Sequence, residues 1–189
     1  MKTSVRIGIG FALVWIILKL TAFNFRIFLN DLRPFIFANM LFVTTAISLT
    51  LYLKNKSLKD TNLMDDVKSG MISGVLYTVI VSGFIYFYYQ SIYPEFNSSK
   101  ISAMELRLED EEQIQEFRKT NPDMENNTSE EIRNKVLTSL SQYYSSQFAM
   151  TVSLLGMLIY ATLNSLVLSL IFRKLFFKNH SDSSAPKVS

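Results

Sequence analysis

The stretch Gly70–Ile92 reads GMISGVLYTVIVSGFIYFYYQSI and contains no charged residue. A bilayer core about 30 Å thick is crossed by a helix of about 20 consecutive apolar residues. A soluble globular protein instead spreads its apolar residues at helix or strand spacing. The stretch therefore predicts a transmembrane helix, and the rest of the chain has to be interpreted around it.

Three further apolar runs lie at residues 7–23, 34–53 and 148–172. The first run contains Lys19, and the other two contain no charged residue. The four runs together predict an all-α integral membrane protein with four transmembrane helices. We interpret residues 1–189 as a single membrane domain.

The first run also allows a second interpretation. Lys2 and Arg6 precede an apolar segment at residues 7–18, and this pattern fits a secretory signal peptide as well. The residues that follow, Thr21-Ala22-Phe23, make a poor cleavage site. We therefore expect the first span to be retained.

The segment between the third and fourth runs, residues 93–147, is rich in charge and predicts a helical loop. Apolar residues at near-helical spacing predict one helix over Lys100–Lys119, which the proline of Asn121-Pro122-Asp123 would end. Thr128 and Glu131 have the spacing of a capping box at the start of a second helix. No proline or glycine interrupts Ser129–Leu155, so we expect this helix to continue into the fourth span.

Basic residues near the ends of the spans predict the orientation, because short cytoplasmic segments carry an excess of lysine and arginine. The N-terminal tail, the second connection and the tail at residues 173–189 are short and basic, whereas the long segment 93–147 has an excess of acidic residues. We therefore expect both termini in the cytoplasm and the acidic segment outside it. The short basic segments contain Lys2, Arg6, Lys54, Lys56, Lys59, Lys68, Arg173, Lys174, Lys178 and Lys187.

Lys19, Asn39 and Asn164 are the candidates for a polar site within the membrane. An isolated charge in the hydrocarbon region is expensive and often marks a pathway or a paired site. A long lysine side chain near a helix end can also extend to the membrane surface, which is the alternative explanation for Lys19. The two asparagines could hydrogen-bond to Lys19, but the sequence alone does not bring the three together.

Small residues predict where the spans pack most closely. The third span begins with a G-x-x-x-G pattern that contains Ser73, and the fourth span carries small residues at multiples of four. Small residues let helix backbones approach in lipid. We expect these faces to form the tightest contact, either within one chain or between two chains. The residues are Gly70, Ser73 and Gly74 in the third span and Ser153, Ala161, Ser165 and Ser169 in the fourth.

The residue types that most catalytic sites need are scarce. The chain has no cysteine, and its single histidine, His180, lies in the polar tail. A catalytic triad, a histidine or cysteine metal site and a phosphate-binding loop therefore have no basis in this sequence. We predict no catalytic, cofactor-binding or metal-binding residues, no enzymatic activity and no nucleic-acid partner.

Three segments suggest a family. They are DVKSGMISG at residues 66–74, YPEF at residues 93–96 and LSLIFRK at residues 168–174. With the four spans and the acidic third loop, the chain resembles a bacterial domain-of-unknown-function family of four-span membrane proteins that is common in Bacteroidetes-type bacteria. The resemblance implies this architecture and a location in the bacterial cytoplasmic (inner) membrane. It implies no activity and no site residues.

Two functional hypotheses follow. The first is a non-catalytic structural or accessory subunit that lies in the lipid bilayer and contacts a protein partner, or a second copy of itself, through residues 93–147. The alternative is a transporter or channel component that uses Lys19, Asn39 and Asn164. An intramembrane enzyme ranks third, because its acid–base groups would have to come from Lys19, tyrosines or carboxylates of the loop.

Overall fold

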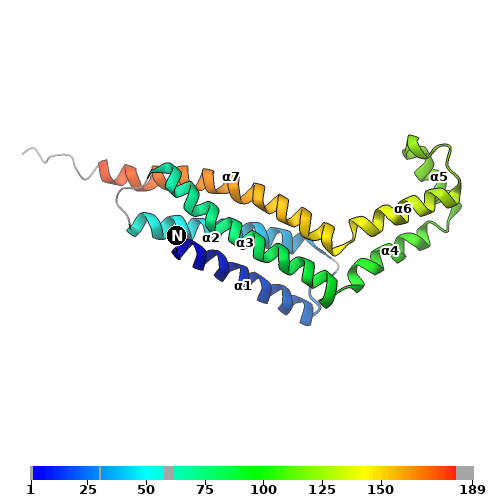
Figure 1. Ribbon diagram of the computed structural model, residues 1–189, viewed down its shortest axis with the longest axis horizontal. Coiled ribbons are helices and arrows are strands. Elements are labelled where there is room, and N and C mark those ends of the chain that lie inside the picture. The colour runs from blue at the N-terminus through cyan, green and yellow to red at the C-terminus, as the bar shows by residue number, and fades with distance from the viewer. Residues whose placement is uncertain (1, 30, 58–61, 182–189) are drawn as a thin grey trace, which may run out of the picture. The chain divides into compact units, whose positions relative to one another are not determined.

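The computed structural model describes residues 2–29, 31–57 and 62–181, and the described residues form helices and turns without a strand (Figure 1). This confirms the all-α prediction. The α-helices are α1 (Lys2–Asn24), α2 (Arg33–Ser57), α3 (Leu63–Phe87), α4 (Glu95–Arg107), α5 (Glu111–Thr120), α6 (Ser129–Tyr143) and α7 (Ser146–Ser181), with a π-helix η1 (Tyr88–Ile92) and a 3-10 helix η2 (Pro122–Met124).

Four of these helical segments are long and apolar enough to cross a bilayer, and they match the four predicted runs. They extend over Lys2–Asn24, Arg33–Lys56, Leu63–Ile92 and Ser146–Leu175. Many large apolar side chains on these helices point outward; Ile17, Phe37 and Ile159 are 62, 69 and 63% exposed. A soluble protein rarely leaves so much apolar surface uncovered, whereas lipid tails cover it without cost.

The chain divides into two compact units. The first unit comprises residues 1–82 and 153–189, and the second comprises residues 83–152. The predicted tail at residues 173–189 begins inside α7, which continues to Ser181. The last part of that predicted tail, residues 182–189, lies outside the described residues.

The core of the first unit comes from α1, α2, α3 and α7 (Figure 1). Trp15 on α1 and Tyr77 on α3 are among its largest fully buried side chains. The start of α2 is capped by Asp31, whose carboxylate accepts a hydrogen bond from the Arg33 backbone amide at 3.0 Å. Pro34 follows in the first turn, where a missing amide hydrogen costs nothing.

The second unit has a small core of its own. Leu108, Ile114, Ile132 and Val136 are buried together and come from α5, α6 and the turn that follows α4. The predicted capping box at the start of α6 is confirmed. The Thr128 hydroxyl accepts from the Glu131 amide at 3.3 Å, and the Glu131 carboxylate accepts from the Thr128 amide at 2.9 Å.

The prediction of one helix over Lys100–Lys119 was wrong, because α4 ends at Arg107 and α5 begins at Glu111. Asp110 caps α5 by accepting a hydrogen bond from the Glu112 amide at 3.0 Å. Arg133 on α6 donates two hydrogen bonds to the Leu108 carbonyl, at 3.3 and 2.9 Å. The turn therefore satisfies its backbone groups and places Leu108 in the same core as Ile114.

The prediction of one helix over Ser129–Leu155 was also wrong, because α6 ends at Tyr143 and α7 begins at Ser146. The Ser145 hydroxyl donates to the Gln142 carbonyl at 2.7 Å and accepts from the Phe148 amide at 3.1 Å. Ser145 thus satisfies the Gln142 carbonyl at the end of α6 and the Phe148 amide at the start of α7, so the break leaves these two backbone groups hydrogen bonded.

Candidate functional site

An ion cluster at the start of α3 is the most highly charged buried feature of the first unit. The turn before α3 is held by Asn62, whose side chain accepts from the Asp65 backbone amide at 2.8 Å. Acidic residues are favourable in the first turn of a helix because of the helix dipole. Asp65 is exposed to solvent, but Asp66 points into the unit and is 0% exposed.

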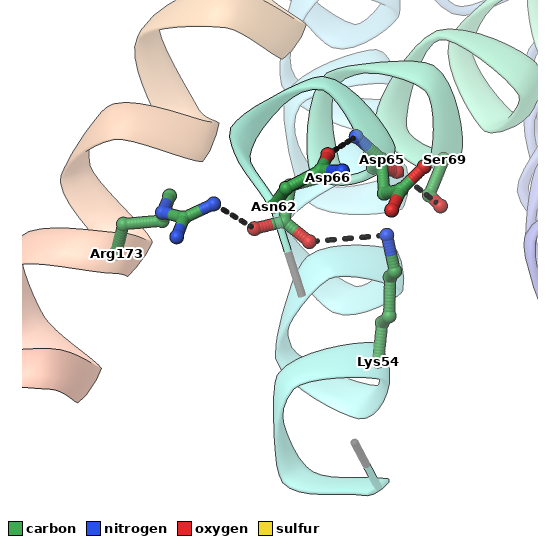
Figure 2. Close-up of polar contacts among 6 residues, drawn as sticks. All are labelled: Lys54, Asn62, Asp65, Asp66, Ser69 and Arg173. Carbon is green, nitrogen blue, oxygen red and sulfur yellow. Dashed lines mark hydrogen bonds and ion pairs between the residues drawn. The ribbon is translucent and has the colours of Figure 1, made fainter. Parts of the chain in front are cut away.

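Asp66 forms ion pairs with two basic residues from two other helices (Figure 2). The Lys54 ammonium from α2 lies 3.1 Å from one carboxylate oxygen, and the Arg173 guanidinium from α7 lies 3.8 Å from the other. The side chains of Lys54 and Arg173 are only 16 and 26% exposed. The cluster therefore joins α2, α3 and α7 at one end of the first unit.

Sequence reasoning missed this cluster, because it considered Lys54 and Arg173 only as orientation signals and Asp66 only as part of a family segment. A signal was present. Asp66 precedes Gly70 by four residues and Ser73 by seven, so the three share one face of a helix. An acidic residue on the packing face, among short basic segments, indicates a buried ion pair.

The small residues of α3 lie where neighbouring helices come closest. A Cβ atom added to Gly74 would lie 2.9 Å from the Ala161 Cβ, and one added to Gly70 would lie 3.2 Å from the Ser165 hydroxyl. A larger side chain at Gly74 would force the α3 and α7 backbones apart, because the Ala161 Cβ is fixed to its backbone, whereas one at Gly70 would displace neighbouring side chains by a few tenths of an ångström. The structure thus brings Gly70 and Gly74 of α3 against Ser165 and Ala161 of α7.

The other predicted small residues differ in their surroundings. Ser73 is fully buried, and its hydroxyl donates to the Ala46 carbonyl of α2 at 3.4 Å. A Cβ atom added to Gly8 of α1 would lie 2.5 Å from the Ser73 carbonyl oxygen. Ser169 is buried and Ser153 is half-buried. The small-residue face of α3 therefore contacts α1 and α2 as well as α7.

The three predicted polar residues engage different neighbours. The Lys19 ammonium lies 3.4 Å from the centre of the Phe35 ring, and Lys19 is 5% exposed. Asn39 accepts a hydrogen bond from the Tyr77 hydroxyl at 2.9 Å. These contacts join α2 to α1 and to α3.

Asn164 belongs to a polar network between α7 and α2. Its amide donates to the Thr44 hydroxyl oxygen at 2.7 Å, and the Tyr160 hydroxyl lies 2.9 Å from the same oxygen. Thr44 itself donates to the Met40 carbonyl at 2.9 Å. Because the Thr44 proton is used there, Tyr160 is the donor to Thr44. All three side chains are half-buried.

The hydrogen bonds and ion pairs described above join neighbouring helices of the first unit. Among residues 2–29, 31–57 and 62–181, no group of three histidine, cysteine, aspartate or glutamate residues could hold a metal ion. The four long apolar helices and the paired polar groups between them define a helical membrane protein.

Comparison with known protein families gives the particular family. The chain belongs to the family described as "Protein of unknown function (DUF4199)", whose model matches residues 6–174. This confirms the resemblance that the sequence suggested. No curated protein and no solved structure matches the chain significantly.

Proposed function

We propose that this protein is a non-catalytic accessory subunit of the bacterial cytoplasmic membrane, with four membrane-spanning helices and both termini in the cytoplasm. The proposal rests on one observation, which is that polar side chains of the first unit contact side chains of neighbouring helices. Asn39, Asp66 and Asn164 each contact a side chain of a neighbouring helix. Groups committed to joining helices are suited to a scaffold.

The second unit is the proposed partner-binding part. It has its own apolar core, so it can hold a defined surface. Residues 93–147 contain eleven acidic and six basic residues, and the exposed acidic residues include Glu109, Glu111 and Glu112. Complementary charge favours specificity and rapid association. The partner is therefore a protein with a basic surface that lies outside the cytoplasm.

Site-specific photo-cross-linking in native membranes tests this proposal. A photoreactive amino acid at Leu106, which is 67% exposed in the second unit, should form an adduct with another protein. The same amino acid at Leu13, which is 51% exposed on α1, is the control and should not capture that protein. Only self-adducts or unmodified chain from the Leu106 position would contradict the accessory role.

Thiol labelling tests the orientation, because the chain has no cysteine of its own. In intact spheroplasts, Leu106→Cys should react with a membrane-impermeant maleimide. Lys174→Cys, at an exposed position near the end of the fourth candidate span, should react only after permeabilisation. The reverse pattern would show that the proposed orientation is inverted.

A second candidate function, a transporter or channel component, is favoured by Lys19. A lysine that is 5% exposed within a candidate span is unusual, and ionisable groups in membranes often belong to ion or solute pathways. In that case, purified protein in liposomes should conduct an ion or solute, and Lys19→Leu should abolish the flux. Absence of flux in the original protein, or equal flux in the variant, would eliminate this candidate.

A further inference from the structure

The connection between α1 and α2, residues 25–32, is apolar although it lies between two helices, where polar residues are usual. Several of its large apolar side chains are uncovered. They are Phe25, Ile27, Phe28 and Leu32, which are 67, 48, 57 and 38% exposed. A group of exposed apolar side chains marks a surface that contacts a membrane or another molecule.

The backbone of the α1–α2 connection adopts a conformation that its residues disfavour. Arg26 and Phe28 have φ angles of 55 and 54°, in the left-handed region that glycine adopts most readily. The Arg26 amide donates to the Phe23 carbonyl at 3.1 Å, and the next amide, that of Ile27, donates to the Ala22 carbonyl at 2.8 Å. These two bonds form a Schellman motif, in which glycine is the usual residue at the position of Arg26. Strained residues persist where other interactions compensate for the strain, and the mostly exposed Phe28 side chain receives little compensation from the described chain.

The charge of the α1–α2 connection fits a phosphate group. Arg33, at the start of α2, lies 3.3 Å from the Asp31 carboxylate and forms an ion pair with it. The charges of this pair cancel, so one positive charge remains, at the exposed Arg26. An arginine guanidinium presents its donors in a planar fork that matches the oxygens of a phosphate.

The position of the α1–α2 connection indicates what covers it. The connection joins the ends of two candidate spans, Lys2–Asn24 and Arg33–Lys56. Because consecutive spans end at the same membrane surface, residues 25–32 lie at that surface. Segments in this interface combine basic residues with phenylalanine and leucine, and their apolar side chains reach roughly 5–10 Å into the boundary between headgroups and acyl chains.

We propose that the α1–α2 connection inserts into phospholipid, with Phe25, Ile27 and Phe28 among the acyl chains and Arg26 on a lipid phosphate. Burial of the apolar side chains then compensates for the left-handed backbone. The inference rests on the proposed insertion of α1 and α2 into the bilayer. It goes beyond that insertion, because a connection between two spans can also extend into water.

Spin labels on single cysteines measure the depth of the connection in lipid nanodiscs, since the chain has no cysteine of its own. Labels at Phe25→Cys and Phe28→Cys should be accessible to oxygen, which dissolves in lipid, and protected from a water-soluble nickel chelate. Leu106→Cys in the second unit is the control in water, because Leu106 and Phe25 are both 67% exposed. Ile159→Cys is the control in the acyl core, because Ile159 is 63% exposed within the fourth candidate span.

Each pattern of accessibility has one meaning. The proposal predicts a depth of roughly 5–10 Å for the two connection labels, shallower than that of Ile159→Cys. If the nickel chelate reaches them as readily as Leu106→Cys while Ile159→Cys stays protected, the spans are inserted and the proposal is refuted. Protection from both oxygen and the chelate would mean that protein covers the connection, which also refutes it. Access of the chelate to Ile159→Cys would refute the insertion of the spans, and the proposal with it.

Substitutions of Arg26 in the Phe28→Cys background test the contact with phosphate. Arg26→Lys keeps the charge and should leave the label at the same depth, whereas Arg26→Glu should move the label toward water, because like charges repel. Asp31→Asn is the control for a charge change in the same connection and should not move the label outward, because Asp31 faces Arg33. Equal depths in Arg26→Lys and Arg26→Glu would overturn the phosphate contact, and so would an outward shift in Asp31→Asn as large as that in Arg26→Glu.

Discussion

We predict that Asp66→Asn lowers the free energy of unfolding of this protein by about 3 kcal/mol. The substitution keeps the size of the side chain but removes the charge that faces Lys54 and Arg173. Removing one partner of a buried ion pair costs about 3–5 kcal/mol, because the remaining charge is left uncompensated. We take the lower end, because Arg173 is 3.8 Å from the carboxylate and both basic side chains are partly exposed.

Unfolding of the full chain in mixed detergent and SDS micelles measures this loss. Asp65→Asn is the matched control, because Asp65 is the preceding acidic residue and is exposed. We expect its effect to lie within about 0.5 kcal/mol of zero. In a double-mutant cycle, Lys54→Met and Asp66→Asn should show a coupling energy of about 0.5–3 kcal/mol.

The reasoning would be refuted if Asp66→Asn, Asp65→Asn and the original chain had the same free energy of unfolding. A cycle without coupling would lead to the same conclusion, because Lys54 and Asp66 would then contribute independently. Either result would mean that the cluster is as well hydrated as a surface ion pair, which contributes about 0–1 kcal/mol.

Three other substitutions, the first with a matched control, test packing in the two units and the cap of α6. Gly8→Ala should destabilise the chain by about 1–3 kcal/mol, because the new methyl group would lie 2.5 Å from the Ser73 carbonyl oxygen. The control Gly10→Ala would meet nothing within 4 Å and should be neutral or slightly stabilising. Thermal unfolding compares the two variants. Leu108→Ala should cost the second unit about 2–5 kcal/mol, seen as faster amide hydrogen exchange in α5 and α6; unchanged exchange would argue against the small core. Thr128→Ala should cost about 1 kcal/mol and increase exchange only in the first turn of α6, and an effect spread over the whole unit would mean that more than a cap was lost.

Features that depend on residues close in the chain were predictable. The four apolar runs became four long helices, because a helix in lipid needs only enough consecutive apolar residues. The capping box of Thr128 and Glu131 was recognised because both of its hydrogen bonds join residues three positions apart. The two helix breaks escaped prediction, because Ser145 and Asp110 are compatible with both a helix interior and a cap.

The sequence by itself determined the helical class, the candidate spans and the positions of the small residues, since each depends on composition or on spacing along one helix. Only the tertiary structure decided which polar groups meet. Asn164 and Thr44 are separated by 120 positions, and no local pattern indicates that they are neighbours. Asp66 likewise acquires its role only when α2 and α7 bring Lys54 and Arg173 to it. Such pairings depend on the rotation and register of whole helices, which the combined packing of all their faces determines.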